Sequence, residues 1–396
     1  MSRVIECDLG MEDRTAIVPK QRYSWRSGRS RRFTQPVATD LSVLFARAVV
    51  ARDSQYVRFT LIACVISATV ATFQFAVFTS FLEAAAVLPR LINADAWIVN
   101  HDVQSFDFPY PIAEDLSAYA LGPLGDLKAE RVVFGFAAWN SPRGRRGNVA
   151  VVGLEHTGLG PREIVVDRSD MERLDLEKDG DTASIGDLRV TLGGQDRRLA
   201  TFLGAPYVIV PLETAREILL YPDGMVSFVA LRGRVSDVAL RAARIRFPEL
   251  SFYSGDEFQT RSSIYWQSKT GAGMAILLAA VLASVLMAIL LSNGISSLIA
   301  RRKGDLISMM VHGATQEEVF RVIFVAAVLV TTSTLAITLI LTPVIDWLSD
   351  PILPWVHFKL KDVLCILCVF MISIIATTWR VQRDIKEFPP HAIFRS

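Results

Sequence analysis

The sequence predicts a membrane protein with four transmembrane α-helices and a large α+β extracytoplasmic domain inserted between helices 1 and 2. Three observations support this fold class. First, 51% of the residues are hydrophobic, too many for an ordinary soluble protein but too few for a chain embedded throughout. Second, several uncharged apolar runs exceed the roughly 20 residues that a helix needs to cross a bilayer. Third, residues 83–269 alternate short β-rich runs with helical patterns.

Charge and cysteine content narrow the function classes. The formal net charge of +2 is nearly balanced, so the composition indicates no bulk attraction to nucleic acid. The four cysteines are Cys7, Cys64, Cys365 and Cys368, and all lie outside residues 83–269. The inserted domain therefore holds no disulfide, even if it faces an oxidising compartment.

The N-terminal part leads into the first span. Residues 1–39 lack apolar periodicity and are rich in Arg and Ser, which predicts a flexible basic cytoplasmic tail. Residues 40–58 predict an amphipathic interfacial helix, and residues 59–82 predict the first span. Arginines precede this span and Glu83 follows it, which places the amino terminus inside. Within the span, Gln74 fits either a helix-packing hydrogen bond or a substrate contact.

Residues 271–299 predict the second span, and residues 300–314 predict a short cytoplasmic helix after it. Arg301, Arg302 and Lys303 mark the cytoplasmic end, because short loops rich in Lys and Arg stay inside. Helical spacing then separates a polar side from an apolar side. The polar side holds Asp305, Ser308 and His312, and the apolar side holds Leu306, Met309, Met310 and Gly313.

Gly313 is a typical helix stop, and Thr315 with Glu318 forms a capping box that begins the next helix. The remaining segments are a third span at 315–345, a short periplasmic loop at 346–362, a fourth span at 363–379 and a cytoplasmic tail at 380–396. Arg380, Arg383 and Lys386 place the carboxyl end inside. Both termini are thus expected to be cytoplasmic.

The residues between the second and third spans resemble a known family. Arg301-Arg302-Lys303-Gly304-Asp305-Leu306-Ile307, followed by His312-Gly313-Ala314-Thr315, is similar to the R-x-x-E-I-x-x-x-x-x-x-G-A-[ST] stretch of the FtsX/MacB/LolCE superfamily of ABC-transporter permeases. Asp305 stands where the family usually has Glu. Tyr265-Trp266 followed by Thr270-Gly271-Ala272-Gly273 resembles the start of the second span in DevC-type permeases.

The resemblance implies a permease homodimer in a bacterial inner membrane that works with a separate ABC ATPase. It also implies a periplasmic adaptor of the membrane-fusion type, an outer-membrane channel and a lipid-like or amphiphilic cargo. Motion of the ATPase would reach the periplasmic domain through the short cytoplasmic helix. The residues expected to form or position this ATPase-coupling helix are Arg301, Arg302, Lys303, Asp305, Leu306, Met309, His312, Gly313, Ala314, Thr315 and Glu318.

The sequence contains neither a G-x-S-x-G nucleophile elbow nor an H-E-x-x-H metal-binding helix. The phosphate-binding pattern G-x-x-x-x-G-K-[ST] is absent, so ATP and Mg are expected on the partner subunit, with no cofactor in this chain. Asp175 to Gly180 begins like a calcium loop, but Gly186 occupies the position of the bidentate Glu, which favours a solvated turn. Cys365 and Cys368 lie one turn apart, and we interpret them as buried small apolar residues rather than a metal or redox pair. No metal site is expected.

Two other functions remain open from the sequence. An FtsX-like mechanotransmitter would regulate cell-wall hydrolases without transporting a substrate. A membrane-anchored receptor without a motor would leave the short helix and the capping box at Thr315 unexplained. The basic trio Arg301 to Lys303 also fits ordinary membrane anchoring on its own.

Overall fold

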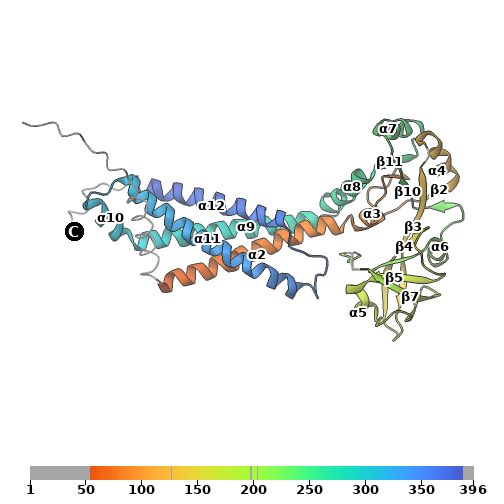
Figure 1. The fold of residues 1–396 in the computed structure, drawn as a ribbon, viewed down its shortest axis with the longest axis horizontal. Coiled ribbons are helices and arrows are strands. Elements are labelled where there is room, and N and C mark those ends of the chain that lie inside the picture. Colours follow the sequence, from red (N-terminus) through yellow and green to blue (C-terminus); the bar gives the residue numbers. More distant parts are fainter. Residues whose placement is uncertain (1–53, 126, 197–198, 203, 387–396) are drawn as a thin grey trace, which may run out of the picture. The chain divides into compact units, whose positions relative to one another are not determined.

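The computed structural model describes residues 54–125, 127–196, 199–202 and 204–386 (Figure 1). The predicted basic tail at 1–39 and most of the predicted interfacial helix at 40–58 lie outside the described residues. The last residues of that predicted helix, 54–58, are described and form the start of α2.

Four helices in the described part of the chain are long and apolar enough to cross a membrane. They are α2 (Ser54–Ala84), α9 (Ala272–Arg301), α11 (Gln316–Ser349) and α12 (Leu360–Lys386). With 34 residues, α11 is about 51 Å long at 1.5 Å per residue, so it exceeds a hydrocarbon core of about 30 Å. Likewise, α12 extends beyond the span predicted at 363–379 at both ends.

The bundle is held together by small and aliphatic side chains of α2 and α9. Cys64, Ala68 and Ala71 of α2 are buried in one cluster with Leu291 and Ile295 of α9. At Gly294 of α9, an added β-carbon would overlap the side chain of Thr60, so the two backbones approach closely. Small residues that allow such an approach are typical of helix pairs in membranes.

The domain between α2 and α9, residues 87–268, is called the inserted domain. Its helices are α3 (Val87–Ile92), α4 (Glu114–Leu121), η1 (Gly122–Leu124), η2 (Arg168–Asp170), α5 (Met171–Leu174), α6 (Leu212–Leu219), α7 (Asp237–Arg246) and α8 (Gly255–Ser268). Its strands are β1 (Ala96–Asn100), β2 (Ile112–Ala113), β3 (Lys128–Asn140), β4 (Arg146–Leu154), β5 (Glu163–Asp167), β6 (Thr182–Ile185), β7 (Leu188–Asp196), β8 (Tyr207–Pro211), β9 (Met225–Val226), β10 (Phe228–Arg232) and β11 (Leu250–Ser254). The predicted fold class, four apolar helices with a large mixed domain between the first two, is confirmed.

Among the described residues, nine strands form one sheet in the order β11-β1-β10-β3-β4-β8-β5-β7-β6. The long strand β3 pairs with β10 through its first residues and with β6 through Trp139 and Asn140. This second pairing closes β3, β4, β8, β5, β7 and β6 into a ring. Pairings β4–β8 and β5–β7 are parallel and the others are antiparallel. The domain therefore has two parts that share β3.

Two cores lie on the sheet. One is mainly aliphatic and lies around Val151, Ile164 and Val208. The other is aromatic and holds Trp97, Phe106, Phe134, Phe228 and Phe258, with ring centroids 4.6–6.4 Å apart in the pairs that touch. Because Phe258 belongs to α8, the aromatic core fixes this helix on the sheet.

Candidate functional site

The short helix between α9 and α11 is α10 (Lys303–Val311). Arg301, the last residue of α9, places its guanidinium 4.3 Å from the ring centroid of Tyr56 and so contacts the start of α2. Arg302 follows with its Nη1 atom 3.3 Å from Oδ2 of Asp305 in the first turn of α10. The basic trio predicted as a cytoplasmic anchor is thus also part of the turn that starts α10.

The end of α10 has the predicted helix stop. His312 donates from Nδ1 to the carbonyl of Ser308 at 2.7 Å, and Gly313 adopts φ +95°, a conformation that favours glycine. The backbone N–H groups of Gly313 and Ala314 then donate to the carbonyls of Met310 and Met309. These bonds satisfy carbonyls that the end of a helix would otherwise leave open.

The predicted capping box at the start of α11 is present. Oγ1 of Thr315 accepts from the N–H of Glu318 at 3.2 Å, and the carboxylate of Glu318 accepts from the N–H of Thr315 at 2.8 Å. Both bonds fix the angle at which the chain turns from α10 into α11.

One face of α10 is packed on α11. Leu306 is 7% exposed and lies in a cluster with Val319, Val322 and Ile323. Met309, Met310 and Ala314 pack against the same cluster, whereas Asp305 and the other face are more accessible. Leu306, Met309, Gly313, Ala314, Thr315 and Glu318 therefore position the helix.

The opposite face of α10 is exposed. It is formed by Gly304, Ser308, Val311 and His312, which follow one another at helical spacing, and Lys303 lies beside it. Val311 is 64% exposed, although it is apolar. Sequence reasoning omitted Val311 from the site, but its position three residues after Ser308 is the signal that assigns it to this face. We call these four residues the exposed face of α10.

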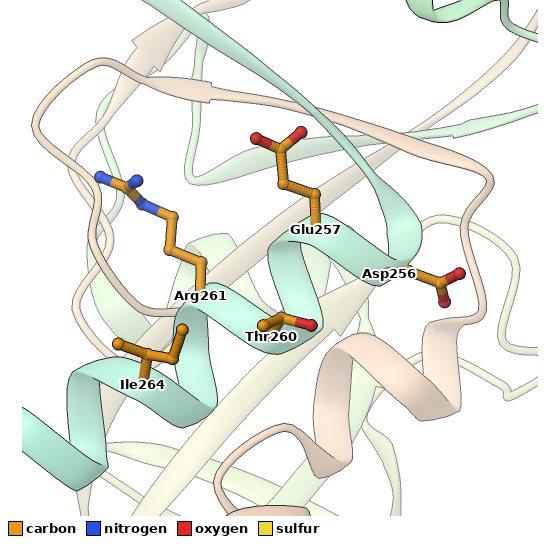
Figure 2. Close-up of a pocket in the computed structure, with 5 residues that line it drawn as sticks. All are labelled: Asp256, Glu257, Thr260, Arg261 and Ile264. Atoms are coloured by element: carbon orange, nitrogen blue, oxygen red, sulfur yellow. The ribbon is translucent and has the colours of Figure 1, made fainter.

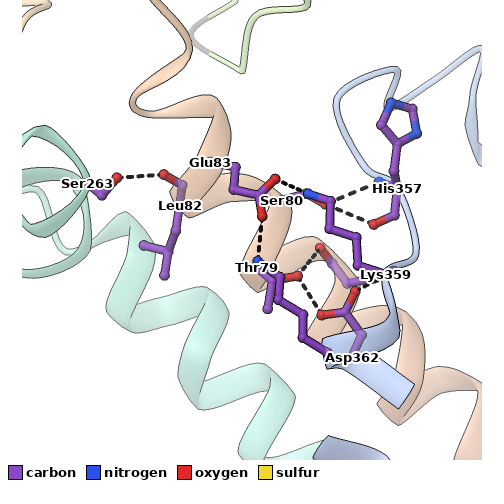
Figure 3. A network of polar contacts seen from close by, with 10 residues as sticks. Thr79, Ser80, Leu82, Glu83, Ser263, His357, Lys359 and Asp362 are labelled. Atoms are coloured by element: carbon purple, nitrogen blue, oxygen red, sulfur yellow. Dashed lines mark hydrogen bonds and ion pairs between the residues drawn. The ribbon is translucent and has the colours of Figure 1, made fainter. Parts of the chain in front are cut away.

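At the other end of the bundle, polar contacts join α2 to the loop before α12 and to the first turn of α12 (Figure 3). The carboxylate of Glu83 accepts from the Nζ atoms of Lys359 and Lys361. Asp362 is fully buried and accepts from Oγ1 of Thr79 at 2.7 Å and from the N–H of Lys359 at 2.9 Å. Ser80 exchanges two further hydrogen bonds with the backbone of His357. The end of α2 therefore has a fixed place beside α12.

The same end of α2 contacts the inserted domain. The Oγ atom of Ser263 on α8 donates to the carbonyl of Leu82 at 2.7 Å, as Figure 3 also shows. An aromatic series connects the parts: Trp355 contacts Phe81, Phe81 contacts Phe202 and Phe202 contacts Trp266, with ring centroids 6.5, 4.9 and 4.9 Å apart. Phe81 is on α2 and Trp266 is on α8, so these rings join the bundle to the domain.

A buried carboxylate lies next to these rings. Asp107 is 3% exposed and accepts from Nε1 of Trp266 at 2.7 Å, from the hydroxyl of Tyr207 at 3.2 Å and from Oγ of Ser105 at 3.4 Å. Burial raises the pKa of Asp107 to about 6, although the three donors act in the opposite direction. Burial, followed by the negative charge of Asp107, raises the pKa of Tyr207 as well. Nothing in the sequence pattern singled out this aspartate.

A shallow cavity of about 410 Å³ lies along the outer side of α8 (Figure 2). It is lined by Asp256, Glu257, Thr260, Arg261 and Ile264. Glu257 pairs with Arg244, and the guanidinium of Arg261 lies 5.1 Å from the ring centroid of Tyr253. Glu257 and Arg261 are therefore engaged in holding α8 against α7 and β11.

In the calcium-like loop, the carboxylates of Asp175 and Asp181 contact other groups of the protein. Asp175 accepts from Oγ of Ser141 at 2.9 Å and pairs with Arg143, and Asp181 accepts from two backbone N–H groups of the loop. The prediction for the cysteines of the fourth span is wrong in one respect, because Cys365 and Cys368 are exposed. They lie on a side of α12 that no other described helix of this chain covers.

No protein-family model and no curated protein matches the sequence. Solved structures do show similarity. The periplasmic region of MacB from Actinobacillus actinomycetemcomitans is 9% identical with a TM-score of 0.31, and the match covers 43% of this chain and 94% of that chain. The extracellular domain of the noncanonic ABC-type transporter YknZ from Gram-positive bacteria is 12% identical with a TM-score of 0.29, covering 41% and 98%. A domain of a putative permease protein from Porphyromonas gingivalis is 14% identical with a TM-score of 0.26, covering 41% and 90%.

Proposed function

We propose that this chain is the transmembrane (permease) subunit of an ABC exporter and that α10 receives the motion of a separate ATPase. The observation that supports the proposal most is the geometry of α10. It is a short helix between two membrane-capable helices, packed on α11 through Leu306, and its other face is exposed. A helix in this place can transmit a push to both neighbours, because each is joined to it by a short turn.

The proposed orientation puts α10 and both termini in the cytoplasm and the inserted domain outside. The charge pattern around α9 and α12 supports it, since Arg301, Arg302, Lys303, Arg380 and Arg383 all lie at one end of the bundle's helices. ATP and Mg would bind on the partner subunit, whose closure would press on the exposed face of α10.

The push would travel along α9 and α11. Arg301 contacts Tyr56 of α2, so the start of α2 would move with the end of α9. At the far end, Phe81 and Leu82 of α2 contact Phe202 and Ser263 of the inserted domain. The described contacts thus support a continuous path from α10 to the inserted domain. This mechanism requires no binding site for cargo inside the bundle.

The sequence resemblance around Tyr265–Gly273 supports a DevC-type assembly as the finer proposal. Two permeases would pair with two ATPase subunits, a periplasmic adaptor and an outer-membrane channel, in a bacterial inner membrane. The exported cargo would be lipid-like or otherwise amphiphilic. The exposed apolar surfaces of α9 and α12 leave room for a second copy of the chain.

The test is affinity purification of the tagged full-length protein from mild detergent, followed by quantitative mass spectrometry. Recovery of a small ATPase with an adaptor protein is the expected result. Recovery of the ATPase with a secreted wall hydrolase would replace export with the regulatory function, and recovery of neither would contradict the proposal. A matched purification with Val311→Glu, which places a charge on the exposed face of α10, is expected to lose the ATPase.

A further inference from the structure

Helix α8 is anchored to the rest of the inserted domain at three successive turns. Phe258 and Ser262 of α8 are fully buried in the domain, and Ser262 accepts from the N–H of Phe106 at 3.2 Å. Trp266, two turns after Phe258, contacts Phe202 and Phe108 with its ring and donates to Asp107 with its Nε1 atom. Three successive turns of α8 are therefore fixed to the domain.

The connection from α8 to α9 is different. Residues 268–272 are exposed, and the helix is interrupted between Ser268 and Ala272. Gly271 adopts φ +76°, and an added β-carbon there would meet nothing within 4 Å. Within the interruption, the hydroxyl of Thr270 donates to the carbonyl of Trp266 at 2.8 Å and accepts from the N–H of Ala272 at 3.3 Å, and Gly273 lies close to the backbone of Gln267. The chain changes direction at the left-handed Gly271, whereas α8 before it and α9 after it are regular helices.

Asp107 holds the last turn of α8 before the interruption. Its two oxygens accept from donors on different segments: Oδ2 from Trp266 and Ser105, and Oδ1 from Tyr207 of β8. A carboxylate can accept at both oxygens, but an amide can accept at one only. Asp107→Asn therefore removes the charged acceptor and puts a donor in place of one acceptor oxygen, which weakens the bonds to Trp266 and Tyr207.

We infer that Asp107, by binding Trp266, holds α8 on the rest of the inserted domain, and we call this contact the clasp. Helix α8 and the rest of the domain then move as one body, and the interruption at Lys269–Gly271 is the joint. Asp107 is then a positioning residue for the motion described above. The role in export rests on the proposed function, whereas the clasp itself does not.

The end of α2 packs beside this joint. Phe81 of α2 packs beside it, because a β-carbon at Gly273 would touch the ring of Phe81. The hydroxyl of Ser263 binds the backbone of Leu82 one turn before Trp266. The end of α2 thus lies against α8 on one side of the joint and against α9 on the other. A change in the angle between α8 and α9 must displace this end of α2.

The clasp is tested by hydrogen–deuterium exchange of the full-length protein in lipid nanodiscs, read by mass spectrometry. In the wild type, amides of α8 should exchange slowly and those of 270–271 should exchange fast. Asp107→Asn and Trp266→Phe should each raise exchange in the last turns of α8 by roughly tenfold or more, as expected for loss of a hydrogen bond to a charged group. Slow exchange of β4 identifies variants that remain folded.

The matched control is Asp102→Asn, which removes a carboxylate from the same loop at a side chain that is 62% exposed. It should leave α8 as protected as in the wild type. Unchanged protection of α8 in both clasp variants would overturn the inference, as would exchange of α8 in the wild type as fast as that of 270–271.

A second measurement separates the clasp from the proposed function. In vesicles that contain the purified complex with its ATPase, both clasp variants should keep ATP hydrolysis and lose at least half of the transport per ATP. Unaltered transport per ATP together with raised exchange in α8 would overturn the role of the clasp in export. The exchange experiment involves no ATPase, so it decides the clasp even if the proposed function is wrong.

Discussion

Removing the side chain of Leu306 should separate α10 from α11. Leu306 is 7% exposed and packs against Val319, Val322 and Ile323. Leu→Ala changes at buried positions cost about 2–5 kcal/mol. The helix has nine residues, a length at which an isolated helix is marginal in water. Because about 1.4 kcal/mol is a factor of ten, Leu306→Ala should shift the docking equilibrium of α10 by roughly 30-fold or more.

The assay is hydrogen exchange of the 303–311 segment, combined with recovery of the ATPase. The matched variant is Val311→Ala on the same helix, where the side chain is 64% exposed. It should leave exchange unchanged, because surface substitutions alter stability by less than about 0.5 kcal/mol, but it should weaken the ATPase contact. Unchanged exchange in Leu306→Ala would refute the assignment of Leu306 as the residue that docks α10. Full ATPase recovery with Val311→Ala would count against the exposed face as the contact.

Three further predictions concern the rest of the chain. Gly294→Ala would force a β-carbon onto Thr60 and should destabilise the bundle by about 1–3 kcal/mol, measured as a lower melting temperature in detergent. Glu83→Gln removes the charge that Lys359 contacts and should speed proteolysis of the 350–361 loop, with an effect of up to about 1 kcal/mol because the pair is partly exposed. The raised pKa of Asp107, about 6, means that the folded domain holds a proton which the unfolded chain releases. The stability contributed by Asp107 should therefore fall by about 3 kcal/mol as the pH rises from about 4 to about 6, and Asp107→Asn should lose this part of the pH dependence, while the part due to Asp170, whose pKa is also raised to about 6, remains.

Each of these three predictions has a matched control variant at another position of the chain. Gly304→Ala lies on an exposed helix surface with nothing near its β-carbon, so it should not lower the melting temperature. Asp346→Asn alters a different carboxylate on the same side of the bundle as Glu83 and should leave the loop as resistant as in the wild type. Asp102→Asn should keep the part of the pH dependence that Asp107→Asn removes. The same unfolding midpoint in Asp107→Asn and in the wild type at every pH would contradict the pKa argument.

Local patterns account for the parts of the structure that were predicted from the sequence. The apolar runs locate the four helices, and Gly313, Thr315 and Glu318 locate the break between α10 and α11, because a helix stop and a capping box involve residues at most four positions apart. The fold class depends on such local signals and could therefore be predicted from the sequence.

The contacts between distant segments were not predictable in this way. Asp107 and Trp266 are 159 positions apart, and Glu83 meets Lys359 across 276 positions. The pairing of β3 with β6 depends on the curvature of the whole sheet. The exposure of Cys365 and Cys368 depends on which side of α12 the other helices cover, and an apolar sequence does not distinguish a lipid-facing side from a buried one.

The central claim is that the exposed face of α10 contacts a separate ATPase, and photo-crosslinking in cells tests it most directly. A photoreactive phenylalanine analogue is placed at position 311, and a control is placed at position 220, where Leu220 is 88% exposed in the inserted domain. The account predicts a crosslink from position 311 to an ABC ATPase and none from position 220. A protein that is inserted and active but forms no crosslink to an ATPase from position 311 would contradict it.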